Sequence, residues 1–196
     1  MTPDPSGPEP VPQDLGGRRG GRHRGEGDAV DRPYIGVAAA SQPSAEVAAL
    51  AHELGRHLAR LGAVIVCGGG YGAMAAVCAG AREEGGLTVG LLPGNDRAEG
   101  SPGLTVALTT GLGEGRNVLL VRASDALVAV GGGFGTLSEI ALALRTGVPV
   151  VGLATWSLAL DGRPVAAYPM FDDPAGAAEA ALTAASERRQ GRTSTS

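Results

Sequence analysis

Short runs of apolar residues alternate along this chain with segments whose apolar residues recur at helical spacing. The runs that we expect to form strands are Tyr34–Ala39, Ala63–Cys67, Thr88–Leu92, Thr105–Leu108, Ala126–Val130 and Val148–Gly152. Strands that are apolar throughout and separated by helices are typical of a parallel sheet covered by helices on both faces. Right-handed crossovers then give a single Rossmann-like, doubly wound α/β domain.

The segments between these strands have the features of helices. Ser44–Leu61 carries apolar residues at helical spacing, and Gly62 follows as a stop signal. The other predicted helices are Gly72–Glu84, Gly113–Ser124, Thr136–Arg145 and Asp172–Ser186. Trp156–Phe171 contains an Asp-Gly turn, and it is consistent with either a hairpin or an irregular return before the last helix.

The two ends of the chain differ in composition from its middle. Residues 1–32 are rich in glycine and proline and contain almost no large apolar side chain, so we expect a disordered tail. From about Glu187 onward the chain is polar, and we expect a second frayed tail over 188–196. One domain is therefore predicted over 33–187.

Composition excludes several classes of function. The net charge is −4, and acidic residues outnumber arginines even in the N-terminal tail, so we expect no nucleic-acid partner. Neither a signal peptide nor an apolar run of about 18 residues is present, so we expect a cytoplasmic protein without a membrane span. All 16 basic residues are arginine. A P-loop lysine and a pyridoxal-binding lysine are therefore excluded.

The cysteines and histidines form no metal or redox motif. Cys67 ends an apolar run and Cys78 lies in a predicted helix, without the spacing of a metal or redox pair. We expect both thiols to be small buried hydrophobic groups. The sequence thus predicts no metal and no resident cofactor.

One pattern occurs twice in the chain: a strand, then Gly-Gly-Gly, an aromatic residue, a glycine and a helix. The first glycine loop is Gly68–Met74, and the second glycine loop is Gly131–Leu137. Each follows the carboxyl end of a predicted strand, where doubly wound domains bind ligands. Glycines let backbone amides approach an anion, and a helix N-terminus favours negative charge. The pattern predicts a phosphate-binding site.

Only the second copy adds side chains that can do chemistry. It contains Thr136 and is followed by Glu139, whereas the first copy has Ala73 and Ala76 at these places. Thr-x-x-Glu at a helix start is also the pattern of a capping box, in which the glutamate folds back on its own helix. A ligand site and a capping box both stay open at this point.

The second glycine loop and its helix resemble the PGGxGTxxE motif of the LOG ("lonely guy") family. The resemblance runs from about Pro33 to Leu153 and includes the first glycine loop. Members once labelled lysine decarboxylases are phosphoribohydrolases, which release a cytokinin base from its riboside 5′-monophosphate. The chain looks most like a bacterial subgroup of LOG-like nucleotide-binding proteins that is also similar to molybdenum cofactor carrier proteins.

The resemblance implies roles for individual residues. Glu139 matches the catalytic glutamate, and Arg116 matches the arginine that works with it at the ribose. The expected phosphate and nucleotide contacts come from Gly132, Gly133, Gly135, Thr136, Gly68, Gly69, Gly70, Met74 and Ser41. The expected partners are a nucleotide or another phosphorylated small molecule, and a second copy of the chain in a homodimer.

Two departures from the family motif bear on function. Gly131 stands in place of the motif's proline, and Gly113-Glu114-Gly115-Arg116-Asn117 stands in place of Met-His-x-Arg-Lys. The changes keep the fold and the anion site but alter the surroundings of Arg116. Two functions therefore stay open: hydrolysis of a nucleoside 5′-monophosphate, and carriage or sensing of a phosphorylated ligand without turnover.

Overall fold

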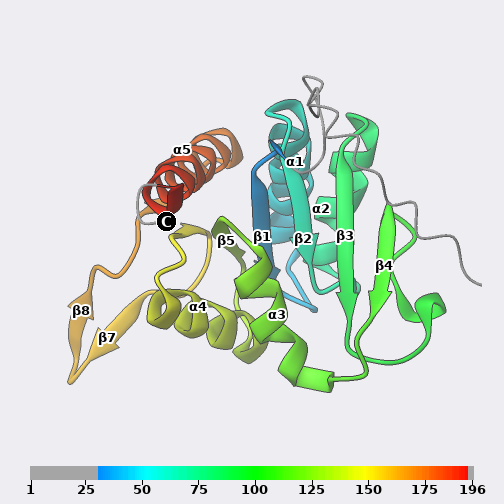
Figure 1. Cartoon of the computed structure of the whole chain (residues 1–196). Helices are drawn as coiled ribbons and strands as arrows, with labels where there is room; N and C mark the ends of the chain where they lie inside the picture. Colours follow the sequence, from blue (N-terminus) through cyan, green and yellow to red (C-terminus); the bar gives the residue numbers. More distant parts are fainter. Residues whose placement is uncertain (1–30, 194–196) are drawn as a thin grey trace, which may run out of the picture.

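A central sheet of seven parallel strands organises the computed structural model, which describes residues 31–193 (Figure 1). The spatial order is β4-β3-β2-β1-β5-β6-β9. The strands are β1 (Tyr34–Ala39), β2 (Val64–Cys67), β3 (Leu87–Leu92), β4 (Val106–Thr109), β5 (Ala126–Val130), β6 (Val150–Leu153) and β9 (Met170–Phe171). The predicted doubly wound α/β fold is confirmed. The edge strand β9 was not predicted, because its two residues are too few to show a period.

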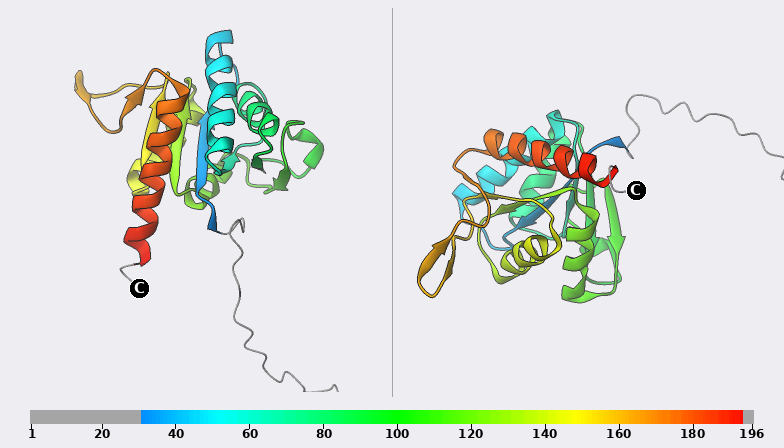
Figure 2. Two further views of the ribbon diagram at one scale, coloured as in Figure 1. Left: turned by 90° about the horizontal axis from the view of Figure 1, so that it is seen from above. Right: turned by 60° about the vertical axis from the view of Figure 1, so that its left-hand side comes forward.

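Helices cover both faces of the sheet, as Figures 1 and 2 show from three directions. The helices are α1 (Ala45–Arg60), α2 (Ala73–Glu83), α3 (Arg116–Ala123), α4 (Phe134–Thr146) and α5 (Pro174–Thr193). One apolar cluster joins α1, α2 and α5 to the sheet, and a second joins α3 and α4 to its other face. None of the helices within residues 31–193 has the length and hydropathy to cross a membrane.

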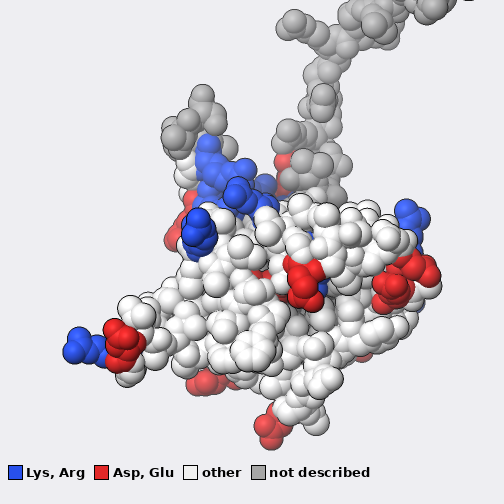
Figure 3. Space-filling model, turned by 90° about the horizontal axis from the view of Figure 1, so that it is seen from below, with Lys and Arg blue, Asp and Glu red and all other residues white. Residues whose placement is uncertain are grey.

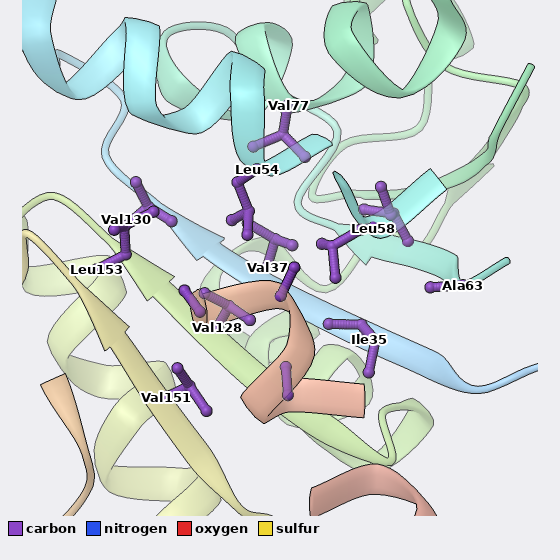
Figure 4. Close-up of a cluster of buried hydrophobic side chains, with 14 of the residues drawn as sticks. Ile35, Val37, Leu54, Leu58, Ala63, Val77, Val128, Val130, Val151 and Leu153 are labelled. Atoms are coloured by element: carbon purple, nitrogen blue, oxygen red, sulfur yellow. The ribbon is translucent and has the colours of Figure 1, made fainter. Parts of the chain in front are cut away.

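The larger apolar cluster fixes the position of β1 in the middle of the molecule (Figure 4). Leu54 and Leu58 of α1 and Val77 of α2 pack with Ile35 and Val37 of β1, and all five side chains are fully buried. Burying each such side chain contributes about 1.5–3 kcal/mol. The carboxyl end of β1 is thereby held rigidly between its two neighbouring strands.

Two helix boundaries differ from the sequence prediction by three residues or more. The helix predicted from Gly113 begins at Arg116, after the short 3-10 helix η3 (Gly113–Gly115), because glycines are poor helix formers. At the other end of the chain, α5 continues to Thr193, whereas a frayed end was predicted from Glu187. Arg188 holds this extension by donating to the carbonyl oxygen of Ser124 at 2.6 Å.

The segment before α5 contains a hairpin. β7 (Leu158–Leu160) and β8 (Arg163–Val165) pair antiparallel around Asp161 and Gly162, both of which have positive φ. Such a turn matches the twist of the two strands. The hairpin alternative for this segment is therefore confirmed. The predicted N-terminal tail lies, up to residue 30, outside the described residues.

Candidate functional site

The order in which strands are added to the sheet reverses at β1, which has β2 on one side and β5 on the other. Doubly wound domains open a crevice at this point, beyond the carboxyl ends of the strands. A cavity of about 320 Å³ lies there, between the end of β1 and the starts of α2, α3 and α4. Figure 3 views the molecule from this end, where most of the surface is uncharged.

The N-terminus of α4 faces the cavity. Gly133 is its N-cap residue and offers no side chain, and the first helical hydrogen bond runs from the Leu137 amide to the Gly133 carbonyl at 2.9 Å. The amides of Phe134, Gly135 and Thr136 precede that bond, so the helix leaves them without an intrahelical partner. These residues line the cavity, and three amides at a helix N-terminus can bind an anion.

At the corresponding end of α2, the first amide of the helix is already bonded within the protein. α2 begins at Ala73, and the Ala73 amide donates to the carbonyl oxygen of Ala40 at 2.9 Å. A Cβ added at the N-cap, Gly72, would collide with the carbonyl oxygen of Ser41. The first glycine loop therefore packs against the end of β1 and supplies Met74 to the cavity wall.

Glu139 and Arg116 meet at the bottom of the cavity. The guanidinium Nη1 of Arg116 donates to the Glu139 carboxylate at 2.8 Å, and Glu139 is only 5% exposed. Burial raises the pKa of the Glu139 carboxyl from its usual 4.5 to about 7, Arg116 partly offsets this, and Glu114 raises it further. Such a carboxyl group can exchange its proton near neutral pH.

Thr136 and Glu139 do not form a capping box. A capping box needs the threonine as N-cap, but Gly133 holds that position and Thr136 lies inside the first turn. Both side chains are buried and line the cavity, and Glu139 is bonded to Arg116 of another helix. The geometry thus excludes the capping box, and the ligand site at this residue pair stays a prediction.

A second polar connection ties α3 to the start of α4. The Asn117 amide donates to Ser138 Oγ at 2.9 Å, and Ser138 Oγ donates to the Gly135 carbonyl at 2.8 Å. Asn117 is the residue that departs from the motif's lysine, and it is buried. Its amide therefore replaces a cation with a neutral link between the two helix starts.

Two glycines of the second loop have free space at their Cβ positions, whereas Gly131 and the glycines of the first loop do not. A Cβ at Gly133 or Gly135 would meet no protein atom within 4 Å. A Cβ at Gly68 would collide with the guanidinium of Arg116, and one at Gly69 would come 3.1 Å from the Cα of Gly90. The glycines of the first loop thus allow Arg116 and Gly90 to approach the backbone closely. Gly133 and Gly135 of the second loop instead leave free space beside the cavity.

The thiols of Cys67 and Cys78 lie beneath the first loop. Both are free and buried, as predicted, and their sulfur atoms are 3.7 Å apart. The hydrogen bond with Cys78 lowers the pKa of the Cys67 thiol. Among residues 31–193, no cluster of three or more His, Cys, Asp or Glu side chains is arranged to hold a metal.

The comparison that decides the family covers most of this domain. The family model described as the SLOG cluster4 family matches residues 32–180. The chain belongs to the SLOG cluster4 family. The resemblance to LOG-like proteins that the second glycine loop predicts is thereby confirmed at the level of the family.

Three proteins that are similar to this SLOG cluster4 chain differ in their descriptions. An uncharacterized protein of Archaeoglobus fulgidus is 41% identical over 124 residues, which are 61% of this chain and 78% of that protein. The cytokinin riboside 5′-monophosphate phosphoribohydrolase of Mycobacterium tuberculosis is 37% identical over 107 residues, 52% of this chain and 56% of that enzyme. The structure of the molybdenum cofactor carrier protein of Chlamydomonas reinhardtii is 35% identical and superposes with a TM-score of 0.71. The match covers 79% of this chain and 99% of that protein.

The structure separates the predicted site residues into two groups. Those that line the cavity are Ser41, Met74, Arg116, Gly133, Gly135, Thr136 and Glu139. Those that do not line it are Gly68, Gly69, Gly70 and Gly132. The cavity is also lined by Ala39, Ala40 and Asn117, and by Phe134 and Glu114, which sequence reasoning did not select. Their signals were an aromatic inside the glycine motif and an acid two residues before Arg116.

Proposed function

We propose that this SLOG cluster4 chain binds a nucleoside 5′-monophosphate and hydrolyses its N-glycosidic bond to a free base and ribose 5-phosphate. The observation that carries the proposal is the buried Glu139 carboxylate, held by Arg116 at 2.8 Å in the cavity at the N-terminus of α4. The relationship to a phosphoribohydrolase supports the reaction type.

In this proposal the N-terminus of α4 binds the phosphate. The amides of Phe134, Gly135 and Thr136 donate to its oxygens, and the helix dipole favours its charge. The free space beside Gly133 and Gly135 allows the phosphate to approach the backbone. A phosphate held there fixes the ribose relative to Glu139.

The chemical step needs a stabilised positive charge and a water molecule. The bond between C1′ and the base nitrogen breaks with its electron pair going to the base, so positive charge builds on the ribose. Water then adds to C1′, and the proton that it loses ends on the base. Glu139 in its ionised form stabilises the charge and orients the water, and Arg116 holds that carboxylate in place.

Purified protein incubated with AMP and other nucleoside monophosphates tests this activity. Chromatography should show a free base and ribose 5-phosphate in equal amounts. Glu139→Gln is the matched control, because it keeps the shape of the side chain and removes its charge. No base release above that control would refute hydrolysis.

A second candidate function is carriage of a phosphorylated ligand without turnover. The neutral Asn117–Ser138 link and the nearby Glu114 set the surroundings of Arg116 apart from the hydrolase motif. The similar fold of a molybdenum cofactor carrier protein favours this candidate. Native mass spectrometry of freshly purified protein should then reveal a co-purified ligand. An empty site and no thermal shift with nucleotides or pterins would count against carriage.

We also propose that the chain acts as a homodimer whose interface includes the start of α3. Leu112, Val118 and Leu119 are exposed apolar side chains that flank Arg116 in sequence. Covering them with a second copy removes this apolar surface from water beside the cavity. Sedimentation should show a dimer that Leu119→Arg converts to a monomer, and a monomeric wild-type protein would contradict the proposal.

A further inference from the structure

The turn that follows β6 contacts the second glycine loop. Thr155 Oγ1 donates to the Gly131 carbonyl at 2.5 Å, and Trp156 Nε1 donates to the Gly133 carbonyl at 3.2 Å. Two side chains that are adjacent in sequence therefore hold two carbonyl groups of the loop, one on each side of Gly132. Neither side chain belongs to the glycine motif.

A peptide group that is held by its carbonyl has its amide direction fixed as well. The peptide unit is planar and trans, so its C=O and N–H point in opposite directions. The carbonyl of Gly133 shares its peptide unit with the amide of Phe134, the first of the three amides that face the cavity. The carbonyl of Gly131 does the same for the amide of Gly132.

The turn itself is held in place by further contacts. The Tyr168 hydroxyl donates to the Trp156 carbonyl at 2.5 Å, and the Trp156 ring lies 6.1 Å from the Phe134 ring. Ala154, just before Thr155, has a φ of 48°, a conformation that alanine adopts rarely. The hydrogen bond from Tyr168 and the ring contact with Phe134 thus hold the Trp156 side of the turn.

We propose that Thr155 and Trp156 are positioning residues, which hold the second glycine loop so that its amides face a bound phosphate. The inference rests on the phosphate site of the proposed function, and it adds the residues that shape this site. A loop containing three consecutive glycines has many accessible conformations, and ordering it on binding weakens the affinity. Two hydrogen bonds from a rigid turn remove that freedom before the ligand arrives.

The test uses Thr155→Val with Trp156→Phe in the full chain, because this double variant removes both donors and keeps similar side-chain shapes. Calorimetry with AMP and with adenosine gives the affinity gained from the phosphate as a ratio of dissociation constants. Losing two hydrogen bonds should lower this ratio about tenfold. Thr155→Ser should keep it within about twofold of the wild type, because it keeps the hydroxyl.

Thr146→Val is the matched control, because the Thr146 hydroxyl also donates to a backbone carbonyl, that of Leu142, at the far end of α4. It should leave the phosphate ratio unchanged. A double variant that folds and keeps the wild-type ratio would overturn the positioning role. Adenosine affinity should change little, which separates this role from a general loss of structure.

A wild-type protein that binds AMP no better than adenosine would instead refute the phosphate site of the proposed function. Amide hydrogen exchange of residues 131–137 in the absence of ligand then tests whether Thr155 and Trp156 order the loop. The double variant should exchange about tenfold faster there than the wild type or Thr146→Val. Unchanged exchange would overturn the inference in that case also.

Discussion

The two glycine loops have nearly the same sequence and different structures. In the first loop the helix begins at Ala73, and its first amide is bonded to the Ala40 carbonyl. In the second loop the helix begins at Phe134, which occupies the place of Tyr71 in the repeat, and its first amides face the cavity. The second helix thus starts earlier relative to its strand, and its N-terminus is left free.

The difference shows that a glycine can be required for two separate reasons. Gly72 is required by the fold, because it has a φ of 71° and a Cβ there would collide with the Ser41 carbonyl. Gly135 lies within a helix, has no protein neighbour where its Cβ would be, and lines the cavity. In the proposed function, the second glycine is required by the ligand.

The largest expected effect comes from replacing Glu139, whose counterpart after the first loop is Ala76. Glu139→Gln should lower hydrolysis of AMP by about 10²–10⁴-fold, because the charge that stabilises the ribose cation is removed. Binding of AMP should persist, since the amides of α4 are unchanged. Steady-state rates and calorimetry on the same samples measure both quantities, and a variant with wild-type turnover would end the catalytic assignment.

Gly72→Ala tests the structural role of the first loop. The substitution places a side chain in the left-handed region and against the Ser41 carbonyl. It should lower the free energy of unfolding by roughly 2–4 kcal/mol. Urea denaturation followed by circular dichroism measures the change. A stability within experimental error of the wild type would show that this loop yields easily.

Gly135→Ala tests whether the second loop is required for ligand binding and not for stability. A methyl group meets no protein atom there and improves helix propensity, so the free energy of unfolding should stay the same or rise by up to about 1 kcal/mol. Affinity for AMP should fall about tenfold, because the methyl occupies space beside the phosphate. Unchanged affinity together with unchanged stability would remove the distinction between the two loops.

A further expected effect is the pH dependence that Glu139 gives to the free energy of unfolding. Its pKa is raised in the folded state from 4.5 to about 7, so the folded protein retains a proton that the unfolded chain has lost. The stabilisation is complete below pH 4.5 and is lost as the pH rises to about 7. Compared with Glu139→Gln, wild-type stability should fall across this window in urea titrations. A difference that is flat or rises with pH would contradict the raised pKa.

The same titration bears on activity. If the ionised carboxylate is the active form, hydrolysis of AMP should decline as the pH falls through about 7. A pH–rate profile of the wild type measures the midpoint. A rate that increases steadily on acidification would assign the reaction to the protonated group instead.

Much of the fold could be predicted because apolar patterning is local. The six predicted strands all occur, with small shifts at their ends, and β1 matches the predicted range. The end of α5 could not be predicted, because its last turns are polar and are held by a bond from Arg188 to the distant Ser124. The start of α3 was shifted by two glycines whose 3-10 turn resembles a helix in sequence.

The site was predictable in part. The motif selected Glu139, Arg116 and the N-terminus of α4, which the structure brings together in one cavity. It also selected Gly68, which lies under the Arg116 guanidinium and not in the cavity wall. Spacing in sequence does not reveal which neighbour a glycine makes room for.

The strand–glycine–helix units and the residue types at the second loop were predictable from the amino-acid sequence, since both depend on neighbours in the chain. Tertiary structure decided which helix end is free, which pKa is raised and which side chains hold the loop. Each of these depends on groups distant in sequence: the Ala40 carbonyl binds the first amide of α2, burial in the folded chain raises the pKa of Glu139, and Thr155 and Trp156 reach the carbonyls of the second loop from the end of β6. Packing alone sets such contacts, because they follow from the order of strands in the sheet.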